Sequence, residues 1–147
     1  MKPINQMNLR VESRSVNESF ARAAVAAFVS QLDPNVEEIS DIKTAVSEAV
    51  TNCIVHAYAD SVGEIYIWTG LYENGLIRIR IRDKGCGIPD VKKAMEPLFT
   101  TSGDERAGLG FAVMESFCDK IKVRSTIGKG TTVTLEKRLE GRDCRND

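Results

Sequence analysis

Hydrophobic and polar residues first alternate and then follow a helical period. Met7, Leu9 and Val11 alternate with polar residues, which predicts a half-buried strand over 7–13. A helix is predicted over 17–32, with Ser15 and Glu18 forming a capping box at its start. The apolar residues expected on its buried side are Phe20, Ala24, Ala27, Phe28 and Leu32.

A second helix is predicted over 36–58, because Asp33-Pro34 ends the first one and apolar residues again recur at helical spacing. Its polar side carries Glu48, Asn52 and His56 at i, i+4 and i+8. Such a row is usually a solvated face, but this one is sparse and has only one charge. The residues expected to face inward are Ile39, Ile42, Val46, Val50 and Ile54.

The period changes to two after residue 63, which indicates strands. Two alternating runs, 65–72 and 76–82, flank Asn74-Gly75, the strongest short-range signal of a β-hairpin. Two more runs, 120–125 and 131–137, flank a turn at 127–130.

The segments between these hairpins are predicted to be a short helix over 91–95, a long mobile loop over 97–108 and a third helix over 109–117. Strands that cluster in hairpins favour an α+β fold, a two-layer sandwich with a mixed, mostly antiparallel sheet and helices on one face. The three arginines that alternate with isoleucines over 76–82 are expected to face solvent. We expect a single domain over 1–139 and a disordered polar tail over 140–147.

Composition narrows the classes of function. The chain has 147 residues, 42% of them hydrophobic, and a net charge of −1 with both signs interspersed. This balance argues against general electrostatic binding to nucleic acid or to an anionic membrane. No secretory signal or membrane-spanning run is evident, and the four cysteines form no CxxC pair. We therefore expect a cytoplasmic protein with free thiols, of which Cys53 and Cys118 fall in apolar patterns.

Two glycine-rich segments are candidates for nucleotide binding. The first, DKGCGIP over 83–89, follows a predicted strand, and its aspartate could accept a hydrogen bond from an exocyclic amine. The second, Gly108-Leu109-Gly110, opens the third helix, where backbone N–H groups favour phosphate oxygens. Taken alone, the first could be an ordinary turn and the second a hinge. Neither is a P-loop or a Rossmann motif. Upstream of the second segment lie hydroxyls and a charge that could reach a terminal phosphate, namely Thr100, Thr101, Ser102 and Arg106.

The motifs gain weight in combination. EAVTN, DKGCG, RAGLG and GKGTT occur in this order and resemble the N, G1, G2 and final GT motifs of the GHKL superfamily, which has the Bergerat ATP-binding fold. More narrowly, SFARAAVAAFVSQLDP, SEAVTNCIVHAY, RDKGCGIPD, EPLFTTSGDERAGLGFAVMESF and GKGTTV resemble the anti-sigma-F factors of endospore-forming bacteria. The resemblance extends from about residue 7 to residue 139.

This resemblance implies a protein-serine kinase that uses ATP and Mg²⁺. Glu48 would be the general base and Asn52 a ligand of Mg²⁺. Asp83 would bind the adenine amine with support from Thr131, while Gly85 and Gly87 would admit the base and ribose. Residues 97–107 would form the ATP lid. The backbone N–H groups expected on the phosphates are those of Gly108, Leu109, Gly110 and Phe111.

The resemblance also implies partners. Arg22 would dock both sigma factor F and an anti-anti-sigma factor, the serine substrate, and Thr51 is a weaker candidate for the same surface. A homodimer in the ATP state would withhold the sigma factor from RNA polymerase. His56 could either touch the nucleotide site or only pack.

Three alternatives remain beside this interpretation. A general-stress anti-sigma kinase of the same fold is the nearest. A purely ATP-gated binding module would lack useful phosphotransfer, although the presence of Glu48 favours an enzyme. A detached ATPase domain of a histidine kinase is disfavoured, because His56 is the single histidine and lies inside the candidate nucleotide helix.

Overall fold

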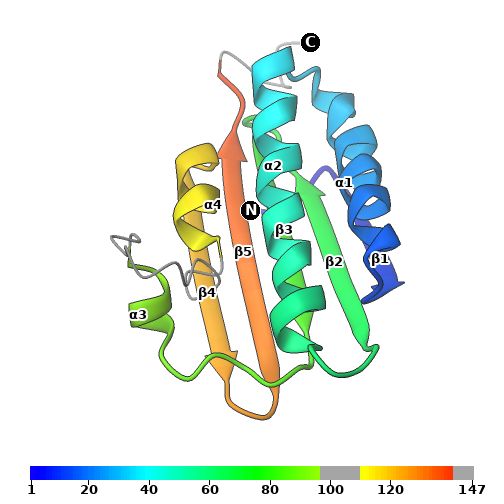
Figure 1. The fold of residues 1–147 in the computed structure, drawn as a ribbon. Coiled ribbons are helices and arrows are strands. Elements are labelled where there is room, and N and C mark those ends of the chain that lie inside the picture. The colour runs from blue at the N-terminus through cyan, green and yellow to red at the C-terminus, as the bar shows by residue number, and fades with distance from the viewer. Residues whose placement is uncertain (97–109, 141–147) are drawn as a thin grey trace.

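The computed structural model describes residues 1–96 and 110–140 (Figure 1). The predicted loop over 97–108 and nearly all of the predicted tail lie outside these residues. In chain order, the helices and strands are β1 (Asn5–Glu12), α1 (Val16–Val29), α2 (Val36–Asn52), β2 (Glu64–Leu71), β3 (Leu76–Asp83), α3 (Val91–Ala94), α4 (Phe111–Phe117), β4 (Lys120–Thr126) and β5 (Gly130–Arg138).

The strands form one sheet in the order β1-β2-β3-β5-β4, and every described pairing is antiparallel. Helix α2 lies between α1 and α4, and all three helices cover the same face of the sheet (Figure 1). The predicted α+β sandwich and both predicted hairpins are therefore confirmed. The register places Asp83, the last residue of β3, opposite Thr131 near the start of β5.

The opposite face of the sheet is open, as the alternation of isoleucine and arginine predicted. Arg80 and Arg82 are exposed, and their guanidinium groups lie 4.7 and 4.8 Å from the ring centroids of Trp68 and Tyr66. Cation–π contacts of this kind hold the long side chains flat on the sheet. Within residues 1–96 and 110–140, none of the helices has the length and apolar character needed to span a bilayer.

The core lies between the inward face of the sheet and the three helices. Branched aliphatic side chains of β2, β3 and β5 pack there against small and aliphatic residues of α1 and α2. Cys53 is buried as expected, whereas Cys118 is only partly buried. Fully buried members of this core include Val25, Val29, Val46, Val50, Ile65, Ile77 and Ile81.

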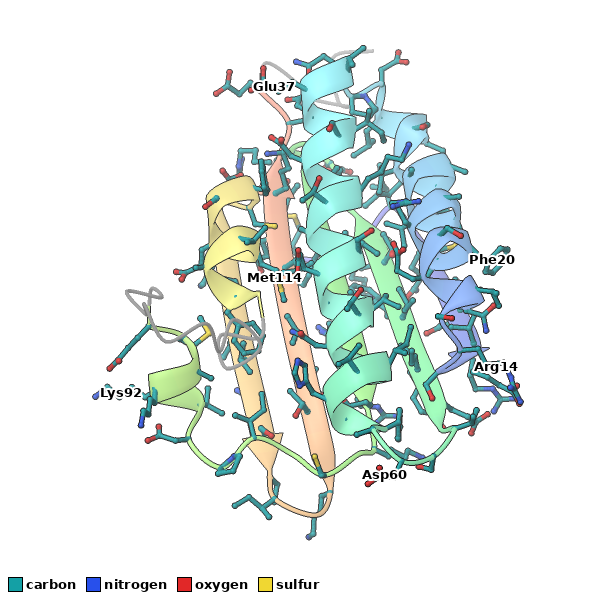
Figure 2. All side chains as sticks on the ribbon, viewed as in Figure 1. Arg14, Phe20, Glu37, Asp60, Lys92 and Met114 are labelled. Carbon is teal, nitrogen blue, oxygen red and sulfur yellow. The ribbon has the colours of Figure 1, made fainter. Side chains whose placement is uncertain are left out.

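Two predictions about α1 are wrong. Phe20 is 52% exposed and points away from α2 (Figure 2), and Ala27 is also exposed. The buried stripe contains Ala21, Val25 and Val29, followed by Leu32 in a short 3₁₀ turn. Alanines occur on several sides of this helix, so apolar spacing did not fix which side faces the sheet.

The capping box predicted for α1 is also absent. The Ser15 side chain makes no capping hydrogen bond, and the Glu18 carboxylate instead accepts a hydrogen bond from Ser47 on α2. A capping box forms at the start of α2, where Asn35 Oδ1 accepts from the Glu38 amide at 2.7 Å and Glu38 Oε1 accepts from the Asn35 amide at 2.9 Å.

The predicted second helix is correct in extent but not uniform. After Asn52 the chain continues as a π-helical turn, Cys53–Ala57, in which the Tyr58 amide bonds to the Cys53 carbonyl at 3.0 Å. Such wide turns occur frequently at functional sites, because they change the direction in which side chains project.

Candidate functional site

A cleft opens where the end of α2 and the π-helical turn face the end of β3 and the start of β5. Its walls are mainly apolar, and a few polar side chains converge on it, a combination typical of small-molecule sites. The cleft is lined by Ala49, Asn52, Cys53, His56, Ala57, Ile81, Asp83, Cys86, Gly87, Ile88, Phe111, Thr131 and Val133. It therefore includes Asn52, Asp83, Gly87, Phe111 and Thr131 from the predicted site.

Asp83 is the buried acid of this cleft. It is 6% exposed, and its Oδ1 accepts hydrogen bonds from the amides of Gly85 at 2.9 Å and Thr131 at 3.2 Å. Burial raises the pKa of its carboxyl, and the two backbone hydrogen bonds oppose this shift. The structure thus brings Asp83 and Thr131 together through the Thr131 backbone, while the Thr131 hydroxyl lies 2.8 Å from Ser125 Oγ.

Cys53 holds the other oxygen of Asp83. Its thiol lies 3.6 Å from Asp83 Oδ2 and 3.4 Å from the Ala49 carbonyl. Burial and the neighbouring carboxylate raise the pKa of this thiol well above its ordinary value, so it stays protonated at neutral pH and can donate to Asp83. We expected Cys53 only to fill the core. No local sequence signal indicated that it also reaches the cleft, because this contact depends on the π-helical turn that begins at Cys53.

The two glycines of the first glycine-rich segment are required by the protein's own packing. A Cβ on Gly85 would lie 2.4 Å from the Ala57 carbonyl oxygen, and one on Gly87 would lie 2.5 Å from that of Thr126. Gly87 also has a φ of +81°, which favours glycine. Gly85 is not among the residues that line the cleft, so its contribution there is the amide that binds Asp83.

Glu48 lies outside the lining of this cleft. A Cβ added to Gly110, the residue before α4, would lie 2.4 Å from Glu48 Oε2, so the carboxylate packs directly against this turn. Burial, and to a lesser degree the charge of Glu18, raise the pKa of Glu48. Glu48 is therefore held between the end of the cleft and a second, more open depression along α2.

That depression, which we call the α1–α2 groove, is lined by Arg22, Val36, Ile39, Ser40, Lys43, Thr44, Ser47 and Glu48. Arg22, the expected docking residue, has a side chain that is 38% exposed, and its Nη1 binds Glu18 and Ser47. Thr51 is exposed and is not part of the groove lining.

Several predicted nucleotide contacts lie outside the described residues, namely Thr100, Thr101, Ser102, Arg106, Gly108 and Leu109. Gly110, with a φ of +68°, and the buried Phe111 are the described part of that segment. His56, for which two roles were open, lines the cleft. The apolar lining from β3 and β5 meets His56 only because these two strands pair in the sheet. The sequence alone does not show this pairing.

The family described as Histidine kinase-like ATPase domain matches residues 11–137 of the chain. The chain is 58% identical over 134 residues to an anti-sigma F factor of Caldanaerobacter subterraneus subsp. tengcongensis, covering 90% of this chain and 93% of that protein. It is 53% identical to an anti-sigma F factor of Priestia megaterium over 92% of this chain and 93% of that protein. The chain belongs to the anti-sigma F factor family.

Solved structures agree on the fold. A Mycobacterium tuberculosis structure of RsbU and RsbW domains matches with a TM-score of 0.67 and 22% identity, over 93% of this chain and 32% of that one. The histidine kinase domain of a blue-light activated kinase from Erythrobacter litoralis matches with a TM-score of 0.58 and 19% identity, over 83% and 61% of the two chains. The family match and the anti-sigma F relatives show an anti-sigma factor with a histidine kinase-like ATPase domain. The solved structures show that such domains share its fold.

Proposed function

We propose that this anti-sigma F factor is an ATP-dependent protein-serine kinase that phosphorylates a serine of its anti-anti-sigma partner. The observation that supports this most directly is the apolar cleft with a buried, fixed carboxylate. A flat base fits between apolar walls, and Asp83 provides the acceptor that an adenine amino group needs. Asn52 and Glu48, at successive turns of α2, extend the site from this cleft towards Gly110.

The residues present fit Mg·ATP. Asn52 offers an amide oxygen at the cleft, and Mg²⁺ typically takes one or two protein oxygens and fills its remaining positions with phosphates and water. Bound Mg²⁺ would neutralise charge on the phosphates. We place the phosphates near Gly110 and Phe111, where the chain enters α4, with the predicted contacts over 100–109 completing that part of the site.

Glu48 is the proposed general base. Its raised pKa makes the Glu48 carboxylate a stronger base than an ordinary glutamate, which favours proton abstraction from a serine hydroxyl. Glu48 also lines the α1–α2 groove. An acceptor serine could therefore approach Glu48 through this groove without passing through the nucleotide cleft. Phosphoryl transfer depends chiefly on positioning and electrostatic stabilisation, so this separation of nucleotide and acceptor sides suits the reaction.

The protein partners are proposed to bind at Arg22. We infer that sigma factor F and the anti-anti-sigma factor compete for this guanidinium, which can pair with a partner carboxylate in a bidentate manner. Thr51 is proposed as a weaker candidate for the same surface. We also propose that the ATP-bound protein acts as a homodimer, and that it is cytoplasmic.

The test of kinase activity is Glu48→Gln, assayed with Mg·ATP and an anti-anti-sigma protein. We expect nucleotide affinity close to that of the parent and phosphotransfer lowered roughly 10²–10⁴-fold, the range for a lost general base. Glu37→Gln on the first turn of the same helix is the matched control and should transfer at the parental rate. Equal transfer by Glu48→Gln and the parent would show that Glu48 is not the base.

A parent protein that binds sigma factor F only with ATP, yet transfers no phosphate, would favour the ATP-gated binding module. The observation that favours this second function, an ATP-gated binding module, is that Glu48 does not line the nucleotide cleft. Measuring sigma binding and phosphotransfer on the same preparation separates the two functions.

A further inference from the structure

Glu18 of α1 contacts Arg22, the proposed docking residue, and Ser47, which directly precedes the proposed base Glu48. Glu18 Oε2 is 3.3 Å from Arg22 Nη1, and the same oxygen accepts a hydrogen bond from Ser47 Oγ. Arg22 Nη1 also donates to Ser47 Oγ at 3.3 Å. These three residues form a closed hydrogen-bonded set across the interface of α1 and α2, which we call the Glu18 cluster.

The Glu18 cluster is partly shielded from water. The side chain of Glu18 is 26% exposed and that of Arg22 is 38% exposed. Charges in such surroundings are screened less than charges on an open surface. In the undocked protein, the positive charge of Arg22, 3.3 Å from the Glu18 carboxylate, therefore opposes part of the field that Glu18 exerts on its neighbours.

One of these neighbours is the proposed base. Glu48 follows Ser47 in the chain and lines the α1–α2 groove together with Arg22 and Ser47. The charge of Glu18 contributes to the raised pKa of Glu48. Among the described residues, Lys43 on α2 is the other charged group that lines this groove, and Gly110, before α4, packs against Glu48.

Resting on the proposed roles of Arg22 and Glu48, we propose that Glu18 is a positioning residue that couples partner docking to the general base. A partner carboxylate that draws Arg22 away leaves the charge of Glu18 facing Glu48 without its counterion. The Glu48 carboxylate then holds a proton more tightly and becomes the stronger base while a partner is docked. Glu18 acts only through Glu48, because it lies on α1 and is not part of the cleft lining.

The coupling predicts opposite effects for two neighbouring charges. Removing Arg22 imitates docking, so Arg22→Ala should raise the pKa of Glu48. Removing the charge of Glu18, by Glu18→Gln or Glu18→Ala, should lower it. If Arg22 acts through Glu18, the effect of Arg22→Ala should shrink when Glu18→Gln is also present, since residues in one network are not additive.

The experiment follows the Glu48 carboxyl carbon by NMR in full-length protein with labelled glutamate, titrated without nucleotide or partner. Glu48→Gln assigns the resonance. Arg10 and Glu64 form the matched control pair, because their ion pair at 3.2 Å lies on the other face of the sheet and is largely exposed. Arg10→Ala and Glu64→Gln should leave the Glu48 titration unchanged.

A Glu48 titration that is the same in the parent, Arg22→Ala and a folded Glu18 variant would overturn the coupling. If both Glu18 variants fail to fold, Arg22→Ala is the remaining test. An unshifted Glu48 titration in this variant would overturn the coupling. The pH profile of kcat should shift in the same directions as the titration. If the parent transfers phosphate but the Glu48 titration does not shift in the variants, the coupling is wrong and the proposed function stands. If the Glu48 titration shifts but the parent transfers no phosphate, the proposed function is wrong and the coupling stands.

Discussion

Asp83 carries an ionisable carboxyl group in a buried position, where burial disfavours the charged form. Asp83 is almost completely buried, and two backbone amides and the Cys53 thiol only partly compensate the carboxylate, because the pKa is still raised. A folded-state pKa above the unfolded value means that the folded protein binds this proton more tightly. The ionised form therefore costs stability at neutral pH, and this cost is relieved as the pH falls through the folded-state pKa.

We predict that Asp83→Asn is more thermostable than the parent at neutral pH without nucleotide, yet binds ATP more weakly. The amide oxygen can keep the bonds from Gly85 and Thr131 without a charge. Each kcal/mol gained would raise the melting midpoint by about 2–4 °C in a chain of this size. Calorimetry from pH 4 to 8 should show the advantage of the variant shrinking as the pH falls.

Unchanged stability together with unchanged affinity for ATP would contradict both parts of this prediction. Cys118→Ser is a suitable control for the procedure, because this thiol lies apart from the cleft. Burial raises its pKa to about 11, so it carries no charge over the tested range and its variant should show no pH-dependent difference.

At the scale of elements, the two long helices begin differently. The capping box of Asn35 and Glu38 starts α2, and Glu38 Oε2 additionally accepts from the Glu140 amide at 3.0 Å. Helix α1 has a serine at the equivalent position without a side-chain bond. The helix that carries Glu48 and Asn52 is thus anchored at its start, and its other end is fixed by the π-helical turn at the cleft.

We predict that Asn35→Ala lowers the free energy of unfolding by about 1 kcal/mol, the usual cost of losing an N-cap side chain. Ser15→Ala is the matched control and should change stability by less than about 0.5 kcal/mol, as expected at a surface position without such a bond. Chemical denaturation of both variants measures the difference. If both variants lose the same free energy of unfolding, the capping hydrogen bond of Asn35 does not contribute measurably to stability.

For the whole molecule, the cleft draws on α2, the π-helical turn, β3 and β5. A ligand that binds such a composite site stabilises the complete fold, because it binds the folded state and not the unfolded chain. At a free concentration about 100 times its Kd, ATP would add about 2.7 kcal/mol. Mg²⁺ would add further stabilisation through the metal–phosphate contacts.

We predict that ATP raises the melting midpoint of the parent, and that Mg²⁺ raises it again. Asn52→Ala should keep the first increase and lose most of the second, because Asn52 is the proposed protein ligand of the metal. Removal of Mg²⁺ with a chelator should return the parent to the midpoint seen with ATP alone. A full second increase in Asn52→Ala would place the metal on other groups.

The sequence by itself determined the elements, the sheet type and the motifs of the site, because apolar periodicity and glycine-rich turns are local signals. Asn74-Gly75 set one hairpin, and the isoleucine–arginine alternation of β3 correctly indicated one covered and one open face. The row of Glu48, Asn52 and His56 predicted a functional side of their helix, and Asn52 and His56 do line the cleft. Pairing β3 with β5 was needed to bring Asp83 beside Thr131.

Only the tertiary structure decided how side chains from different elements meet. The phase of α1 depends on its packing against α2 and the sheet, which is why Phe20 proved exposed. Glu18 was predicted to cap its own helix, but the approach of α2 offered Ser47, and the carboxylate bonds there instead. Cys53 reaches Asp83 because the chain widens into a π-helical turn at that point. These contacts join residues far apart in the chain, so no local pattern encodes them.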